Sequence, residues 1–129
     1  MQSILSTNSS IEMVFDVHRD ALGSDSEYAP KVKIGDEYAA QIMFVIGTNG
    51  GGLYHPNWQY NLKFAIKVQQ KAEELYPGLF KQMIVTNSRY NQHTAPCASI
   101  IEVGATGNTL EECITSMKYF AIVLDEALK

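Results

Sequence analysis

Short apolar runs, separated by polar or glycine-containing stretches, predict four buried β-strands. They lie at residues 11–17, 37–46, 82–86 and 98–103. The run at residues 11–17 reads as a strand with two apolar faces, which is typical of a parallel sheet covered on both sides. A polar stretch at residues 3–10 precedes it and resembles the tail of a helix, and residues 23–30 have the composition of a loop.

A fifth, shorter strand is predicted at residues 31–34, directly before the run at residues 37–46. Gly35 and Asp36 lie between them and suit a two-residue hairpin turn. Lysines alternate with branched apolar residues along the short strand, as on a half-exposed edge strand. The pattern therefore predicts a hairpin that leads into the second buried strand.

Two helices are predicted from apolar residues at helical spacing. The first covers residues 57–76 and ends at Pro77 and Gly78. The second begins after Thr109, which forms a capping box with Glu112. The stripe of the first helix is Leu62, Ala65, Ile66, Gln69, Ala72 and Leu75. The stripe of the second is Leu110, Cys113, Ile114, Met117, Phe120, Ala121, Leu124 and Leu128.

The order of these elements predicts an α/β domain with a mostly parallel, twisted sheet flanked by helices. At 129 residues and 46% hydrophobic content, the chain fits one domain at residues 1–129 and can bury a real core. The net charge of −4 offers no basic stripe, which argues against a nucleic-acid partner. Two cysteines, Cys97 and Cys113, do not indicate a disulfide framework, and Cys113 is expected to be a buried free thiol.

Two residues near strand ends are candidates for chemistry. His18 follows the first strand and Glu102 lies near the end of the fourth, and parallel strands would bring both to one rim of the sheet. A carboxylate within an apolar strand is costly to desolvate unless it has a partner or a task. For Glu102 the structural alternative is an ion pair with Arg19 or Arg89. For His18 it is a hydrogen bond to a loop carbonyl.

Two loops invite functional interpretations. The loop at residues 88–93 is dense in hydrogen-bond donors, and Arg89 suits a forked carboxylate contact, although a solvated loop has the same composition. The glycine-rich loop at residues 47–52 lacks the Lys-Ser/Thr pair of a phosphate-binding loop, because Leu53 and Tyr54 follow it. We therefore expect a loop over the site and not a phosphate cradle.

Several segments, taken in order, carry a resemblance to a known family. They are DVHRDA at 16–21, NW at 57–58, NL at 61–62, AIKVQ at 65–69, LYPGL at 75–79, NSRYNQH at 87–93, IEVG at 101–104 and GNTLEE at 107–112. Each segment is short, but the combination is specific and extends from about residue 11 to the end. The chain resembles the catalytic domain of the stage II sporulation protein P family.

That resemblance implies a fold and an activity. The family is similar to zinc-dependent N-acetylmuramoyl-L-alanine amidases, which cleave the bond between muramic acid and the stem peptide, and its members are also associated with cleavage of stem-peptide cross-links. His18 matches a zinc-binding histidine and Glu102 matches the glutamate that acts as general acid and base. Arg19, Arg89, Asn91 and His93 are expected to contribute to substrate binding.

The resemblance also implies that the zinc site is incomplete here. Amidases of this kind use three protein ligands, and in the family two of them precede the segment that matches this chain. We therefore expect the C-terminal part of an amidase domain, inactive by itself and prone to self-association through an open sheet edge. The parent would be membrane-anchored and extracytoplasmic at the engulfing sporulation septum. Its partners would be peptidoglycan, a lytic transglycosylase and a membrane scaffold protein.

Two other classes of function remain open from the sequence. The chain could be a non-catalytic module that binds peptidoglycan or a partner through the Trp58 and Arg89 regions. Alternatively, it could be an unrelated α/β domain that binds a small anion at the strand ends.

Overall fold

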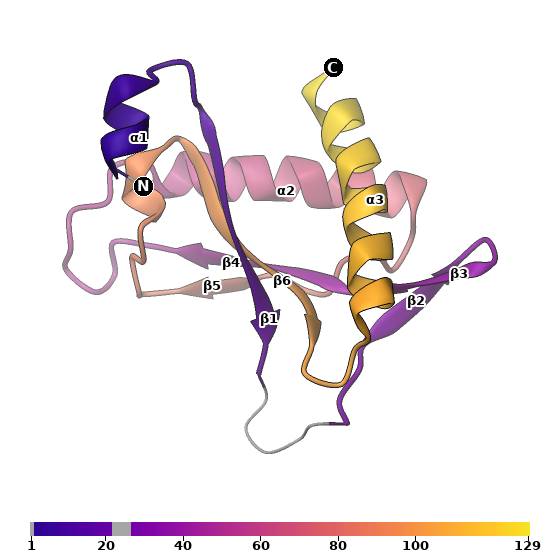
Figure 1. Ribbon diagram of the computed structural model, residues 1–129. Helices are drawn as coiled ribbons and strands as arrows, with labels where there is room; N and C mark the ends of the chain where they lie inside the picture. Colours follow the sequence, from indigo (N-terminus) through magenta and orange to yellow (C-terminus); the bar gives the residue numbers. More distant parts are fainter. Residues whose placement is uncertain (1, 22–26) are drawn as a thin grey trace.

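Four strands form the main sheet, and two long helices pack against it (Figure 1). The computed structural model describes residues 2–21 and 27–129, so part of the loop expected at residues 23–30 lies outside the described residues. The strands are β1 (Met13–Asp20), β2 (Lys31–Ile34), β3 (Glu37–Ala40), β4 (Ile42–Gly47), β5 (Ile84–Thr86) and β6 (Cys97–Ala105). The helices are α1 (Gln2–Thr7), α2 (Trp58–Leu75), the short 3-10 helix η1 (Gln92–Thr94) and α3 (Leu110–Leu128).

The sheet is mixed, with mostly parallel pairing. Its strand order is β1-β6-β4-β5. The β1–β6 and β4–β5 pairs are parallel, whereas β4 and β6 are antiparallel. This confirms the expectation of an α/β protein with a mostly parallel sheet, and it places β1 and β5 at the two edges.

One face of the sheet carries the main core. The fully buried side chains Ile42, Phe44 and Ile46 alternate along β4 and pack in the same cluster as Ile101 of β6. Helices α2 and α3 cover this face with buried residues that include Ala65, Val68, Ala72, Phe120 and Val123. The intervening residues point the other way, and of these Met43, Val45 and Ile100 form a separate small cluster. The second face of the sheet is thus only thinly covered.

The edge strand β1 is less buried than expected. The sequence pattern predicted two buried faces, but residues from Asp16 to Arg19 are exposed and Val17 is 57% exposed. The prediction was wrong because β1 pairs on one side only, and α3 covers only part of its inner face. Phe15 is the inward-facing residue that packs best, with its ring 5.4 Å from that of Phe120.

The apolar run at residues 37–46 forms two strands and not one. Strand β3 pairs with β2 in a separate two-stranded sheet, and Gly35, with φ of 59°, occupies the predicted two-residue turn. Gln41 separates the strands because its backbone bonds Pro30 and Gly104 while its side-chain amide donates to the carbonyl of Gly78 at 2.8 Å. The polar Gln41 marks this point in the sequence, but the apolar residues on both sides of it do not predict a change of sheet.

Helix α2 has nearly the predicted bounds, but its buried face is shifted. The buried residues are Asn61, Ala65, Val68 and Ala72. Ile66 and Leu75, two members of the predicted stripe, are each 40% exposed. The polar Asn61 is buried instead, because its side chain holds the loop at residues 87–96. The apolar pattern gives no signal for this role.

The start of α3 confirms the predicted capping box. The Thr109 hydroxyl accepts from the Glu112 amide at 3.1 Å, and a Glu112 carboxylate oxygen accepts from the Thr109 amide at 3.0 Å. Glu112 also accepts from Lys31 Nζ at 2.7 Å and from the Asn108 side-chain amide at 2.9 Å. These hydrogen bonds, that from Lys31 foremost, lower the pKa of Glu112 below its ordinary value of 4.5.

We predict that Glu112→Gln destabilises the protein by about 1–2 kcal/mol at neutral pH, because charge-assisted hydrogen bonds are lost. A depressed native pKa gives stability that is fully present above the unfolded value and is lost as pH falls through the native value. The gap in unfolding free energy between wild type and variant should therefore shrink below about pH 4.5. Urea unfolding at several pH values measures it, and the exposed neighbour Glu111→Gln is the control. A gap that does not change with pH would contradict the assignment.

Candidate functional site on the open face of the sheet

A pocket lies on the thinly covered face of the sheet. Strands β1, β4, β5 and β6 contribute to it, and the loop after β5 closes one side. Its lining residues are Asp16, His18, Asp20, Met43, Val45, Ile84, Thr86, Tyr90, Asn91, Ile100 and Glu102. Three of the candidate residues from the sequence, His18, Asn91 and Glu102, therefore meet on a face of the sheet and not at the rim where strands end.

Strand register brings His18 and Glu102 together. They are direct partners in the parallel β1–β6 ladder, and Met43 of β4 is the partner of Glu102 on its other side. Partnered residues in a ladder point to the same face of the sheet. His18 and Glu102 thus lie side by side, as expected from their positions near the ends of two parallel strands.

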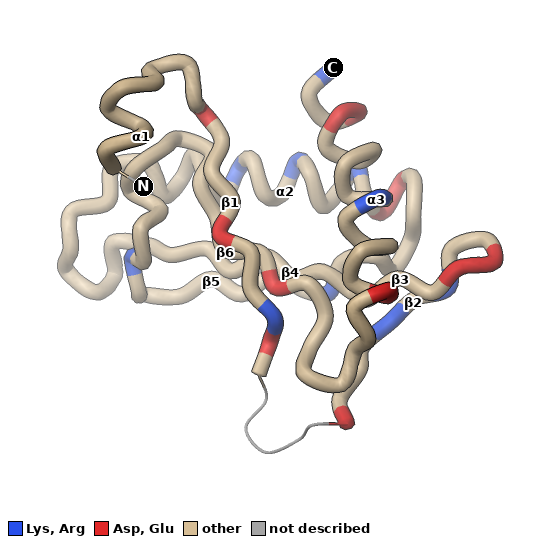
Figure 2. Tube along the Cα trace, in the orientation of Figure 1, with Lys and Arg blue, Asp and Glu red and all other residues tan. Residues whose placement is uncertain are grey.

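Charged groups surround Glu102 without bonding its inner oxygen. Oε2 of Glu102 is buried and has no hydrogen-bond partner in the described part of the chain. Burial raises the pKa of the Glu102 carboxyl above its ordinary value, the His18 charge opposes this rise, and Asp20 adds to it. Acidic positions gather along β1 and at the middle of the sheet in Figure 2. The pKa of a carboxyl in this setting lies closer to neutral pH than the pKa of an exposed carboxyl.

Neither arginine proposed as a structural partner pairs with Glu102. Arg19 points to the opposite face of β1, where its guanidinium lies 3.5 Å from Sγ of the buried, free Cys113. Arg89 donates to the carbonyl of Tyr54 at 3.1 Å. The ion-pair alternative for Glu102 is thereby excluded for these two residues.

His18 and Asp20 each have a charged neighbour. Nε2 of His18 lies 3.0 Å from Oδ1 of Asp16, two residues earlier on the same face of β1. Asp20 pairs with Lys81 at 3.3 Å, and both of these side chains are more than four-fifths buried. Sequence reasoning missed Asp16, Asp20 and Lys81 as members of the site. The period of two along β1 was the available signal for the two aspartates.

The loop at residues 87–96 is held over the sheet by buried amides. Gln92 accepts from the Gly47 amide at 2.9 Å and donates to the Val45 carbonyl at 2.8 Å. Asn61 of α2 donates to the Gln92 carbonyl at 2.9 Å and accepts from the Ala98 amide at 3.2 Å. The Gln92 side chain thus ties the loop to β4, and the Asn61 side chain ties the loop backbone to α2.

A glycine allows the same loop to approach closely. A Cβ at Gly47 would collide with the carbonyl oxygen of Ser88, so a larger residue would push the loop away from β4. The glycine-rich segment therefore packs against the loop at residues 87–89. It takes no part in the lining of the pocket that contains His18 and Glu102.

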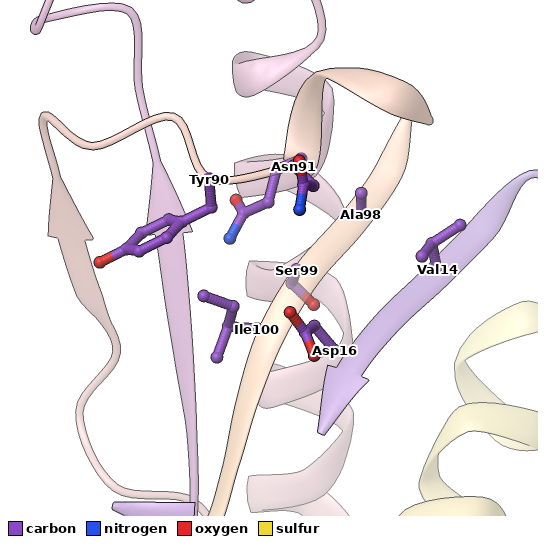
Figure 3. Close-up of a pocket in the computed structure, with 8 residues that line it drawn as sticks. Val14, Asp16, Tyr90, Asn91, Ala98, Ser99 and Ile100 are labelled. Carbon is purple, nitrogen blue, oxygen red and sulfur yellow. The ribbon is translucent and has the colours of Figure 1, made fainter. Parts of the chain in front are cut away.

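Tyr90 and Asn91 are the loop residues that line the pocket. Tyr90 has a φ of 53°, a left-handed conformation that costs a non-glycine residue about 1 kcal/mol or more. Figure 3 shows both side chains beside Ile100, with Asp16 on the opposite side of the adjoining hollow. Of the four proposed substrate-binding residues, Asn91 is therefore the one that the structure brings to His18 and Glu102.

Arg89 and His93 lie in a different group. The ring centroids of His93 and the buried His55 are 6.5 Å apart. Burial lowers the pKa of both histidines, and the nearby Arg89 charge lowers it further. Both effects favour the neutral form of these two rings, which lie on the side of the loop that faces the glycine-rich segment.

The described residues contain no group of three or more His, Cys, Asp or Glu side chains placed to hold a metal ion. His18 nevertheless shares one feature of metal-binding histidines, because one of its ring nitrogens contacts a carboxylate. The part of the chain at residues 2–21 and 27–129 also has no helix with the length and apolar character needed to span a bilayer.

The fold and the pocket together define a mixed α/β protein with a histidine–glutamate pair on the open face of its sheet. A family model described as stage II sporulation protein P matches residues 1–125. The chain belongs to that family and is a sporulation protein. No curated protein and no solved structure matched the chain.

Proposed function

We propose that this chain supplies the His18–Glu102 half of the active site of a zinc-dependent N-acetylmuramoyl-L-alanine amidase with an amidase-like fold. The observation that carries the proposal is the direct pairing of His18 with Glu102, whose buried Oε2 has no hydrogen-bond partner among the described residues. A buried carboxyl with a raised pKa beside a histidine is a common arrangement in acid–base catalysis.

Glu102 would move the proton. A carboxyl with a pKa raised by burial can accept a proton from an attacking water and return it to the leaving nitrogen of an amide. The Glu102 carboxyl would carry the proton, and none of the described residues bonds its Oε2 and competes for that role. Zinc, when bound, would lower the pKa of a coordinated water to about 7 and polarise the amide carbonyl.

His18 would be one zinc ligand. If Nε2 donates its proton to Asp16, Nδ1 keeps the lone pair that binds a metal. Asp16 would also fix the orientation of the ring. Because the described residues offer no group of three ligands, the other ligands would come from protein outside the described residues.

The wider role follows from the family. Cleavage of stem peptides from glycan, and of their cross-links, would fit a sporulation protein that acts on peptidoglycan at the engulfing septum. The proposed partners are peptidoglycan, a lytic transglycosylase and a membrane scaffold protein, with the parent protein anchored outside the cytoplasm.

We predict that the purified chain binds well under one zinc per molecule and releases no stem peptide from peptidoglycan. A single histidine does not hold zinc tightly, since catalytic sites use three protein ligands. Elemental analysis and chromatography of digested sacculi measure both properties. Stoichiometric zinc together with released stem peptide would contradict the incomplete site.

The same protein, extended by the segment that completes the site, separates an enzyme from a binding module. The extended protein should bind one zinc and release stem peptides, and His18→Ala should lose both properties. Tyr54→Ala, which removes an exposed side chain outside this pocket, is the matched control. Binding of peptidoglycan without any release by the zinc-loaded extended protein would favour the non-catalytic module.

A further inference from the structure

The pocket around Glu102 has two unlike walls. Strand β1 and Glu102 of β6 form a polar wall with three carboxylates and one imidazole: Asp16, Asp20, Glu102 and His18. The opposite wall is apolar and consists of Met43, Val45, Ile84, Ile100 and the ring of Tyr90. A ligand that fills the pocket must therefore present a polar edge to one wall and an apolar face to the other.

Tyr90 is held in place at a conformational cost. It is the one non-glycine residue with a positive φ among the described residues. The bonds of Gln92 on its C-terminal side, and the close approach of Gly47 to Ser88 on its N-terminal side, fix the loop around it. Such strain persists where the surroundings enforce it, and it is concentrated at functional sites.

The Tyr90 ring is not held as a core residue. It is 46% exposed, and Ile84 next to it in the pocket is equally exposed. Beneath them, Met43, Val45 and Ile100 are nearly buried and give the wall a firm base. An exposed aromatic ring on an apolar base is a surface on which the flat C–H face of a pyranose can stack.

The charge of the polar wall favours the uncharged glycan of peptidoglycan over its anionic stem peptide. Lys81, the basic residue nearest the polar wall, is already paired with Asp20. An anionic peptide would be repelled there, because three carboxylates outnumber the one lysine and one imidazole beside them, whereas an uncharged N-acetylated sugar would not. Its hydroxyls and amide can also bond to Asn91 at the edge of the pocket.

We propose that the apolar wall is a subsite for one N-acetylated sugar ring of the glycan, which would contact Tyr90, Ile84 and Ile100. The orientation of the sugar in this subsite rests on the proposed function, because in an amidase the amide next to the sugar would lie over Glu102. Tyr90 acts here as a stacking platform, and its strained backbone sets the direction of the ring.

Binding of N-acetylchitotetraose, an uncharged glycan, to the chain as it stands tests the subsite. We expect NMR shifts at Tyr90, Ile84 and Ile100, and an affinity that falls about tenfold or more in Tyr90→Asn. Asparagine tolerates the left-handed conformation, so the variant should unfold at a urea concentration no lower than that of wild type. Tyr90→Phe keeps the ring and should bind within about twofold of wild type.

Tyr60→Ala is the matched control, because it removes a 62% exposed tyrosine from α2, on the other side of the sheet. Unchanged glycan affinity in a folded Tyr90→Asn would overturn the subsite, as would tighter binding of the dipeptide L-Ala-D-Glu than of the glycan. Glycan binding needs no zinc, so it is independent of the amidase proposal. Tyr90-dependent glycan binding without hydrolysis by the extended protein would support the subsite and contradict the amidase. If hydrolysis depends on Glu102 but Tyr90→Asn leaves both KM and glycan affinity unchanged, the amidase is supported and the subsite is contradicted.

Discussion

Glu102→Gln should abolish hydrolysis by the zinc-loaded extended protein while leaving its fold and zinc content intact. Glutamine has nearly the same shape but cannot take a proton from water, and loss of a general acid–base group lowers turnover by roughly 10²–10⁴-fold. Because Oε2 of Glu102 has no hydrogen-bond partner to lose within residues 2–21 and 27–129, the exchange removes little of the bonding that the structure describes. Stem-peptide release, zinc content and urea unfolding would be measured together.

The matched control for this variant is Glu111→Gln, which removes an exposed carboxylate from α3 and should leave turnover unchanged. Glu102→Asp keeps the carboxylate but shortens the side chain, and we expect it to retain part of the activity. Full activity in Glu102→Gln would show that another group moves the proton, and the acid–base role would then be wrong.

Phe120→Ala should cause the largest loss of stability among single substitutions in the core, about 3–5 kcal/mol. Phe120 is 3% exposed and joins the strands to α3. Its ring centroid lies 5.4 Å from that of Phe15, 6.0 Å from that of Phe80 and 6.5 Å from that of Phe44. The alanine would leave a cavity among three aromatic rings that a packed core does not close completely.

Urea unfolding of Phe120→Ala and Phe120→Leu measures this loss, and the leucine should recover more than half of it by refilling the space. Tyr54→Ala removes a 79% exposed aromatic side chain and should stay within about 0.5 kcal/mol of wild type. A loss below about 1 kcal/mol in Phe120→Ala would contradict a core centred on these rings.

Periodicity was sufficient to predict most of the secondary structure. The apolar spacing and the Thr109 capping box correctly placed α2 and α3, and the apolar runs placed β5 and β6 near their observed bounds but joined β3 and β4 into one strand. The same patterns report only that a residue is apolar, not which neighbour covers it. That is why β1 was expected to be buried on both faces although it is an edge strand with one partner.

The predicted site residues separate for a similar reason. His18 and Arg19 are adjacent in sequence, and a strand turns adjacent side chains to opposite faces, so Arg19 does not line the pocket that His18 shares with Glu102. This was predictable from alternation alone. The separation of Asn91 from Arg89 and His93 was not, because the loop path depends on buried hydrogen bonds from Gln92 and Asn61.

The pairing of His18 with Glu102 was predictable in outline. Both residues were placed near the ends of strands assumed to be parallel, and β1 and β6 are indeed parallel neighbours. The sequence had no signal for the open face on which they meet, or for the wall of Tyr90 opposite them. Those features depend on which face α2 and α3 cover, and that is decided by packing of the whole domain.

Identification of the bond that is cut tests the central claim most directly. Mass spectrometry of sacculi digested by the zinc-loaded extended protein should detect stem peptides with a free N-terminal alanine and glycan whose muramic acid has lost its peptide. Both products should be absent with Glu102→Gln. Peptides that stay attached to the glycan, or the same products in equal amount from Glu102→Gln, would contradict an amidase site built on His18 and Glu102.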